Sequence, residues 1–364
     1  MTNTLSDLNT VGSGSYLPND VHFLLQPVQM EVTDVAEKER LIQSKQKHYS
    51  EMISLESAPT EVHKALYQRA LGQNGVRMAT DVQALALALN EACTGPSIVL
   101  VSFVRAGLPL GVLLRRALID MGRDSHHYGI SIVRDRGIDS VALEAIITAH
   151  GAENIVFVDG WTGKGAISGE IQRSLNGDSR FPRDPRLVVL ADPCGHSWLS
   201  ASAEDWVIPS GILGATVSGL VSRSIWPVDG GLHGCVVYDH LQAHDVTRDF
   251  IEHIDAQRKT LGSVHRATPW TDAQRVELQN AAGHVVKSLA ERFGIKNLNR
   301  VKPGIAEATR AVLRRVPDHV LVRDRHDSDV QLLLHLTEGA GVSVEEVGAA
   351  LGPYRAVTII RSVS

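Results

Sequence analysis

Short apolar runs that alternate with helical segments occupy the middle of the chain and constrain its fold more than any other feature. SIVLVSF, residues 97–103, is rich in β-branched residues and is bounded by glycine-containing turns, as expected of a strand buried on both faces. HYGISIV, NIVFVD and RLVVLADP are similar runs, and a helical pattern separates each from the next. This alternation predicts an α/β fold in which helices cover both faces of a parallel sheet.

The rest of the chain divides into parts of different character. Residues 1–20 are rich in Gly, Ser, Thr and Asn without periodicity, which predicts a flexible N-terminal arm. The sheet domain is predicted to extend over residues 21–245, with an irregular cap that begins at Asp192. Residues 246–298 have the pattern of a helical connector, and residues 299–364 combine helix and strand patterns. The last part is predicted to be a small separate α/β domain.

Composition limits the class of protein. With 364 residues, 43% of them hydrophobic, the chain can bury a sizeable core. It has no apolar run of about 18 residues and no basic start followed by an apolar stretch, so we expect a cytoplasmic protein without a membrane span. Its three cysteines, Cys93, Cys194 and Cys235, are too few and too scattered for a disulfide framework. The net charge is −5, but residues 264–364 are basic, which indicates either a polyanionic partner or an ordinary solvated surface.

Three loops that follow predicted strands carry charged or glycine-rich sequences. The first contains Arg105 and Gly107, and the second contains Arg134 and Arg136. Because the carboxyl ends of parallel strands meet at one edge of a sheet, we expect these loops to converge. The third loop begins at Asp159 and continues through Thr162, Gly163, Lys164, Gly165 and Ala166.

Such loops indicate a ligand with phosphate and sugar groups. Glycine-rich loops at helix N-termini expose backbone N–H groups that hold phosphate, and arginines grip a second anionic group. GWTGKG lacks the spacing and the Ser/Thr of a Walker A loop, and no GxGxxG opens the first strand–helix unit. A nucleoside triphosphatase or a dinucleotide oxidoreductase is therefore disfavoured.

NIVFVDGWTGKGAI and VSFVRAGLPL resemble the phosphate and pyrophosphate loops of type I phosphoribosyltransferases. The resemblance implies that phosphoribosyl pyrophosphate is bound with Mg²⁺, and that the protein is a homodimer. Arg105, Arg134 and Arg136 would neutralise the pyrophosphate, and Asp159 would orient the ribose. The family usually has two adjacent acids at this strand end, whereas Asp159 is followed by Gly160.

GSYLPNDVHFLL, KHYSEMISLE and VDGWTGKGAI are similar to segments of a phosphoribosyltransferase-like family encoded with tellurium-resistance stress operons. This resemblance covers residues 12–240. It implies transfer from phosphoribosyl pyrophosphate to a base-like or RNA-linked acceptor in a stress-response pathway. A regulator that binds a nucleotide-like ligand and RNA without catalysis remains an alternative, as does a structural RNA-associated protein.

A different chemistry is indicated by Cys194 and His196, two residues apart in DPCGHS. A cysteine needs a basic partner to become a nucleophile, and families similar to this one carry the name of a cysteine protease, StiP. A distant histidine could equally be the partner: His126, His127 or His233. A buried structural thiol is the alternative role for Cys194.

The C-terminal segments KPGIAEATR, HVLVRD and GVSVEEVGAALG resemble the Pelota-type RNA-binding domain. Gly304, Glu307 and Arg310 match its Gly-x-Asn-Glu-x-x-Lys motif, while Ala306 replaces the Asn. The resemblance implies RNA as a partner of residues 299–364. The residues that would contact RNA are Lys302, Gly304, Glu307, Arg310, Arg314 and Arg315.

Overall fold

A six-stranded parallel sheet forms the centre of the molecule. The computed structural model describes residue 5 and residues 8–362. The predicted α/β class and parallel sheet are confirmed. In spatial order the strands are β1 (His22–Phe23), β4 (Ser125–Ile130), β3 (Ile98–Phe103), β7 (Ile155–Val158), β8 (Leu187–Ala191) and β9 (Leu199–Ser202).

Strand β3 lies in the interior of the sheet, between β4 and β7, and all six of its side chains are buried. Val101 lies opposite Tyr128 of β4 on one side and opposite Phe157 of β7 on the other. The rings of Phe103 and Phe157 stack with centroids 5.5 Å apart. An apolar run without polar alternation therefore marks a strand covered on both faces, as predicted.

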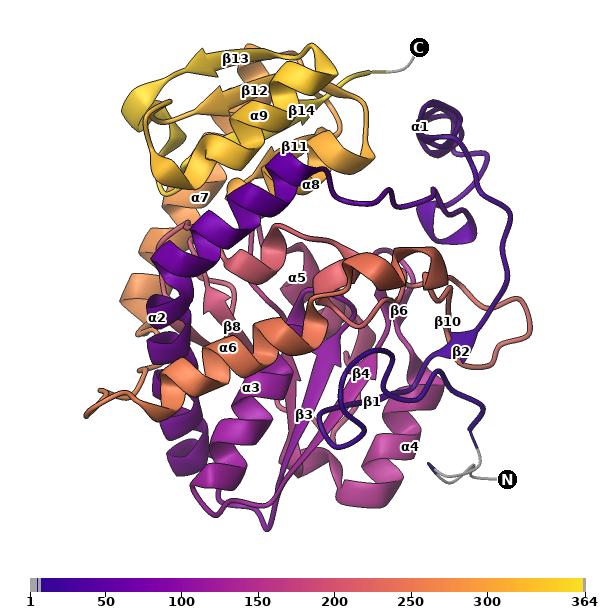
Figure 1. Cartoon of the computed structure of the whole chain (residues 1–364), viewed down its shortest axis with the longest axis vertical. Helices are drawn as coiled ribbons and strands as arrows, with labels where there is room; N and C mark the ends of the chain where they lie inside the picture. Colours follow the sequence, from indigo (N-terminus) through magenta and orange to yellow (C-terminus); the bar gives the residue numbers. More distant parts are fainter. Residues whose placement is uncertain (1–4, 6–7, 363–364) are drawn as a thin grey trace.

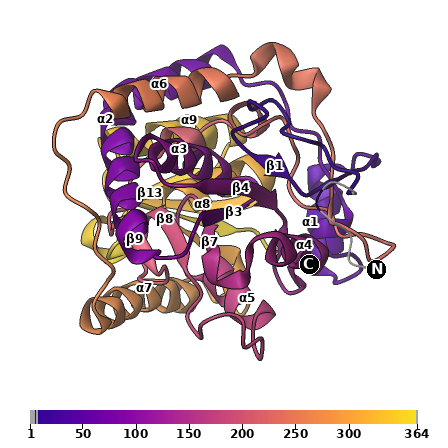
Figure 2. The ribbon, with the colours of Figure 1, turned by 90° about the horizontal axis from the view of Figure 1, so that it is seen from below.

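Helices cover both faces of the sheet (Figure 2). α2 (Glu61–Ala92), α3 (Gly107–Asp120) and α6 (Thr247–Lys259) lie on one face, and α4 (Ser140–His150) and α5 (Ala166–Ser174) lie on the other. Helix α2 continues unbroken over 32 residues. Gly75, unfavourable for a helix in isolation, lies where a Cβ would meet Gln257 of α6 at 2.7 Å. Tertiary packing has outweighed local propensity here.

The N-terminal region is packed against the sheet. Tyr16 is 1% exposed and its ring lies 6.2 Å from that of Phe23. The backbone N–H of Phe23 donates to Gly12 O at 2.7 Å. The prediction of a flexible arm is therefore wrong for residues 8–20, because Tyr16 supplies apolar surface that the composition of the segment did not reveal. Residues 1–4 and 6–7 of the predicted arm lie outside the described residues.

The remaining elements that precede α6 are short and lie outside the six-stranded sheet. They are β2 (Gln26–Pro27), α1 (Val35–Gln43), η2 (Tyr49–Glu51), β5 (Ile132–Val133), β6 (Gly137–Ile138), η3 (Ala152–Asn154), η4 (Pro209–Gly211), η5 (Ala215–Val217), β10 (Gly234–Cys235) and η6 (Asp239–His244). β10 pairs with β2, so the cap that begins at Asp192 is anchored to the N-terminal region.

The C-terminal unit follows a long helix, α7 (Asp272–Arg292), which begins with a capping box at Thr271. A four-stranded sheet in the order β11-β14-β12-β13 carries two helices on its face. The bounds are η7 (Leu298–Arg300), β11 (Val301–Pro303), α8 (Ile305–Arg314), β12 (Pro317–Val322), η8 (Ser328–Val330), α9 (Gln331–Ala340), β13 (Ser343–Glu346), η9 (Gly348–Leu351) and β14 (Ala356–Ile360).

The two units share a hydrophobic core. Ile305 and Val312 of α8 belong to the same apolar cluster as Trp206 of the cap and Leu100 of β3. Figure 1 shows the C-terminal unit, in yellow, stacked on one end of the sheet domain, with α2 running alongside both. The units are therefore joined by apolar contact as well as by the connector. No helix within the described part of the chain combines the length and the apolar character needed to cross a membrane.

Candidate functional site

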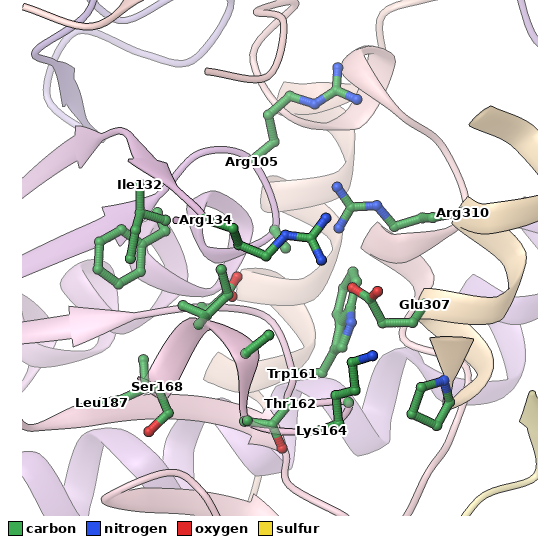
Figure 3. Close-up of a pocket in the computed structure, with 18 of the residues that line it drawn as sticks. Arg105, Ile132, Arg134, Trp161, Thr162, Lys164, Ser168, Leu187, Glu307 and Arg310 are labelled. Carbon is green, nitrogen blue, oxygen red and sulfur yellow. The ribbon is translucent and has the colours of Figure 1, made fainter. Parts of the chain in front are cut away.

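A cavity of about 180 Å³ lies where the sheet reverses its strand order. The chain runs from β3 to β4 on one side and then to β7 on the other, and in open α/β sheets ligands bind at such a point, beyond the carboxyl ends of the strands. Arg105, Arg134 and Asp159 line this cavity from three loops of the sheet domain. Glu307 and Arg310 of α8 line it from the C-terminal unit (Figure 3).

The loops after β3 and β7 approach each other closely. A Cβ on Gly107 would lie 2.2 Å from Val158 O, and one on Gly160 would lie 2.8 Å from Ala106 O. Glycine is needed at both positions because the two backbones touch there.

Two of the arginines assigned to pyrophosphate are already paired. Arg105, 6% exposed, donates to the Glu56 carboxylate at 2.8 Å and to Val221 O at 3.0 Å. In Figure 3 its guanidinium points away from those of Arg134 and Arg310. Arg136 forms an ion pair with Glu51. Arg134 faces the cavity and forms no ion pair with any residue that the structure describes. The predicted anion clamp is therefore incorrect for Arg105 and Arg136.

The loop from Thr162 to Ala166 uses its polar side chains for internal contacts. The Thr162 hydroxyl donates to the Asp192 carboxylate. Lys164 Nζ donates to the carbonyl oxygens of Leu298 and Val301, and burial lowers its pKa to about 8. Tyr354 of the C-terminal unit donates to Gly163 O at 2.6 Å. The loop is therefore fixed by the C-terminal unit, and neither Thr162 nor Lys164 has the free side chain expected of a phosphate ligand.

Asp159, at the end of β7, is 8% exposed. Its Oδ1 accepts the Gly160 N–H at 2.8 Å, but burial dominates and raises the pKa of the carboxyl to about 7. A carboxyl with this pKa is partly protonated at neutral pH.

This burial predicts a stability difference that depends on pH. Because the folded-state pKa of Asp159 is above its unfolded value, its contribution to stability is fully present below about pH 4 and is lost progressively as the pH rises from about 4 to about 7. We expect the stability advantage of Asp159→Asn over wild type to be larger at pH 8.5 than at pH 5 by more than about 1 kcal/mol, measured by urea denaturation. Asp184→Asn, at an exposed aspartate, is the control and should show no such difference. An equal effect at both pH values would contradict the assignment.

Cys194 lies on the loop after β8, also beyond the carboxyl end of the sheet. Its Sγ is fully buried and donates to Thr162 Oγ1 at 3.1 Å. The backbone N–H of Gly165, the N-cap of α5, acts on the same thiol to lower its pKa. Burial and the nearby Asp192 carboxylate raise the pKa of the thiol well above its usual value. The thiol is therefore protonated in this conformation.

Asp192 organises the loop around Cys194. Its carboxylate accepts the backbone N–H and the hydroxyl of Ser197, both at 2.7 Å, and the N–H of His196 at 3.1 Å. The indole N–H of Trp270 donates to it at 3.2 Å. These bonds hold the pKa of Asp192 below its usual value despite its burial.

The histidines suggested as partners of Cys194 are in different situations. His196 is half-buried and its ring packs on the backbone of Gly165; across the described residues neither ring nitrogen has a hydrogen-bond partner. His127 is bonded through both nitrogens, to Ser102 and to Asp20 O. His126 and His127 lie at the start of β4, at the opposite edge of the sheet, and His233 is bonded to Ser131. His196 is the candidate on the same loop.

The residues expected to bind RNA face inward. Lys302, 4% exposed, and Arg310 line the interdomain cavities together with Glu307. Gly304 lies against the Asp205 carboxylate of the cap, and Arg314 is paired with Glu56 at 3.4 Å. The side of α8 that carries these motif residues packs against the sheet domain, so they face that domain and not solvent. Arg315 is paired with Glu39, which is also inaccessible.

Several residues of the site were missed in the sequence. Glu56 pairs with Arg314 of the C-terminal unit, and Asp205 accepts the N–H of Ile305 from the same unit. Lys38 and Arg223 line a second cavity. Glu56 ends the segment KHYSEMISLE, which carried a family resemblance and so offered a signal. Within residues 8–362 there is no group of three or more His, Cys, Asp or Glu that could hold a metal ion.

Comparison with known proteins places the chain in a family. A family model described as "Tellurite-like stress resistance cysteine protease StiP" matches residues 14–255, well over half of the chain. The chain belongs to the StiP family. It is 52% identical over 364 residues to a protein named "Cysteine protease StiP" of Acinetobacter baylyi, covering 96% of this chain and 94% of that relative.

The chain is also similar to a second family model and to a solved structure. A model of the PELOTA RNA binding domain matches residues 280–362, which confirms the predicted Pelota resemblance and extends it back into α7. A crystal structure of inhibitor-bound glycine decarboxylase (P-protein) of the glycine cleavage system covers 98% of the StiP-family chain and 91% of its own, with 13% identity. Its TM-score is 0.24, so nothing follows from it for the fold.

The prediction of phosphoribosyl transfer is wrong. The family model and the Acinetobacter baylyi relative both carry the name of a cysteine protease, and neither supports the phosphoribosyltransferase resemblance. The pairing of Arg105 with Glu56 and of Arg136 with Glu51 gives a structural reason, since the predicted pyrophosphate clamp is occupied by carboxylates. The expectation of Mg²⁺ depended on that substrate and loses its basis with it.

Proposed function

We propose that this StiP-family protein is a cysteine peptidase of a stress-response pathway and that Cys194 is its nucleophile. The observation that carries the proposal is the position of Cys194 beyond the carboxyl end of the parallel sheet, with Sγ 3.1 Å from Thr162 Oγ1 on the loop that leads into α5. The thiolate is the reactive form of cysteine, and a helix N-terminus stabilises it through oriented N–H groups. The name of the 52% identical relative supports the same chemistry.

The other two cysteines fit this role less well. Cys93 follows the end of α2 and precedes β3, at the amino end of the sheet, and it is buried. Cys235 lies in β10, and burial raises its pKa to about 12.

His196 is the proposed general base. Burial lowers the pKa of its imidazole, which keeps the ring neutral and able to accept a proton. In the proposed reaction, the thiol proton passes to His196, the thiolate attacks a peptide carbonyl to form a thioester, and the amine leaves with that proton. Water then cleaves the thioester and restores the thiol. N–H groups at the start of α5 are placed to stabilise the oxyanion.

The structure corresponds to a resting state. The sulfur is fully buried beneath α7, whose Gln279 donates to Gly195 O at 3.0 Å and whose Arg275 donates to Ser197 O at 3.1 Å. A substrate reaches Cys194 after α7 has moved. Movement would also rehydrate the thiol, which lowers its pKa toward the usual range.

The assignment is tested by cysteine substitution. We expect Cys194→Ser to abolish cleavage of an unfolded protein substrate such as reduced casein, with His196→Ala reducing the rate by about 100-fold or more. Cys93→Ser and Cys235→Ser are the matched controls and should retain activity. Circular dichroism checks that each variant is folded. Activity that survives in Cys194→Ser would contradict the proposal.

A further inference from the structure

A second cavity, of about 210 Å³, adjoins the first and is strongly basic. The two cavities share Val104, Ile132, Arg134, Glu307 and Arg310 in their walls, so these residues stand between adjacent cavities. Among the described lining residues of the second cavity, Glu307 is the one acidic side chain. The basic lining residues used below are Lys38 of α1, Arg134 after β5, Arg223 of the cap, and Lys302, Arg310 and Arg314 of the C-terminal unit.

Some of these charges are balanced by protein groups. Arg314 pairs with Glu56, and Arg223 donates to the carbonyl oxygens of Tyr49 and Met52. Among the described residues, the partner of Lys38 Nζ is a hydroxyl, Ser54 Oγ, at 3.4 Å. Carbonyl and hydroxyl oxygens are uncharged, so hydrogen bonds to them do not neutralise the positive charge of the cavity.

Three cations have no hydrogen-bonded partner among the described residues. Within the described part of the chain, the side chains of Lys302, Arg310 and Arg134 make no hydrogen bond or ion pair, although Lys302 is only 4% exposed. Arg310 lies over the ring of Trp161 at 5.7 Å and Arg134 lies over that of Tyr49 at 5.5 Å. Figure 3 shows the guanidinium groups of Arg134 and Arg310 pointing toward each other across the cavity.

Burying unpaired like charges together is unfavourable. Burial, with neighbouring cations adding to it, lowers the pKa of Lys302 well below its usual value and that of Lys38 to about 7. A protein that keeps such a cluster only for stability would do better with neutral side chains. The arrangement is instead the one that binds a compact polyanion, because arginine forks and lysine ammonium groups are the usual ligands of phosphate.

We propose that this interdomain cavity binds a small molecule with two or more linked phosphate groups, held between Arg134 of the sheet domain and Lys302 and Arg310 of the C-terminal unit. The shared chemistry is the oligophosphate chain, either free or as part of a nucleotide. Because its ligands come from both units, the molecule bridges them and stabilises their docking. Binding involves neither Cys194 nor His196, so the proposal goes beyond the peptidase function and stands or falls separately.

Isothermal titration calorimetry at low ionic strength tests the proposal with inorganic tripolyphosphate, inorganic phosphate and adenosine triphosphate. We expect tripolyphosphate to bind one site per chain and more tightly than phosphate. Lys302→Met and Arg310→Gln should each weaken that binding by at least about tenfold. Lys287→Gln removes an exposed cation of α7 and should leave it unchanged. Tighter binding of adenosine triphosphate would identify a nucleotide as the source, and equal binding would identify the phosphate chain itself; both support the proposal.

Thermal unfolding separates loss of binding from loss of folding. Ligand-free Lys302→Met should have a Tm equal to or above that of wild type, because an unpaired buried charge has been removed. Tripolyphosphate should raise the Tm of wild type and of Lys287→Gln but not that of Lys302→Met. Absence of saturable tripolyphosphate binding, or equal affinity in all variants, would overturn the proposal. So would an RNA oligonucleotide that binds with the same dependence on Lys302 when tripolyphosphate and adenosine triphosphate do not.

Discussion

Replacing Gln279 and Arg275 of α7 with alanine together should raise the rate at which iodoacetamide alkylates Cys194 by about sixty- to seven-hundredfold. Both side chains donate to carbonyl oxygens of the loop that carries Cys194, at 3.0 and 3.1 Å. A hydrogen bond contributes about 1 kcal/mol and one from a charged group about 1.5–3 kcal/mol. Since each 1.4 kcal/mol changes an equilibrium tenfold, losing both shifts the opening of α7 by the stated factor.

The expected rate depends on opening because the thiol is inaccessible otherwise. Cys194 is fully buried in an apolar cluster with Val285 and Leu289 of α7. A Cβ on Gly195 would lie 2.9 Å from both Arg275 O and Leu278 Cβ, so helix and loop are in tight contact. Alkylation in this situation follows the population of the open state.

The measurement is mass spectrometry of the alkylated peptides over time. Cys93 and Cys235 are buried elsewhere and serve as internal references for global unfolding. The matched control is Glu277→Ala with Asn280→Ala, which changes the exposed side of the same helix. If peptidase activity resides at Cys194, it should rise in parallel with alkylation. An unchanged rate, or an equal rise at all three cysteines, would show that α7 is not the cover.

The sheet could be predicted from the sequence because its signal is local. Ile98–Phe103 is apolar at nearly every position and a strand buried on both faces needs this pattern. The strand β9 was missed, since Leu199–Ser202 contains two serines and lacks that pattern. Its position at the edge of the sheet explains why a polar sequence suffices.

The site could be predicted in part. That loops after β3, β5 and β7 lie near one edge follows from parallel strand topology. The sequence does not show which arginines are free of ion pairs. Glu56, the partner of Arg105, lies about fifty residues away in sequence, and Glu51, the partner of Arg136, lies about eighty-five residues away. Long-range ion pairs leave no pattern in a single sequence.

The sequence also did not show which side of the Pelota-like helix α8 faces the sheet domain. The amphipathic pattern of α8 shows an apolar and a basic side, and a basic side is normally solvated. Here Arg310 and Lys302 are covered by the sheet domain, so their charges face a cavity. Only the contact between the two units distinguishes an RNA-facing side from a cavity-facing one.

The contact between the units should depend strongly on one carboxylate: we expect Asp205→Ala to lower the free energy of unfolding by about 2–4 kcal/mol. Asp205, 7% exposed, accepts the N–H of Ile305 at 3.0 Å and the N–H of Arg355 at 2.8 Å. Helix α8 begins after Gly304, which has no side chain to cap it, so the cap comes from Asp205 of the other unit. Alanine leaves both N–H groups buried without an acceptor.

Urea denaturation measures the loss, and amide hydrogen exchange locates it. Exchange should accelerate at Ile305 and Arg355 and along α8 before it does in β3, because the contact between units opens first. Glu204→Ala is the matched control: the neighbouring carboxylate is 61% exposed and pairs with Arg77 at 3.0 Å, so its loss should cost less than about 1 kcal/mol. Equal losses in the two variants would mean that Asp205 is not the cap. A large loss confined to Asp205 would show that docking of the C-terminal unit, which also forms the wall of the basic cavity, depends on a single buried acceptor.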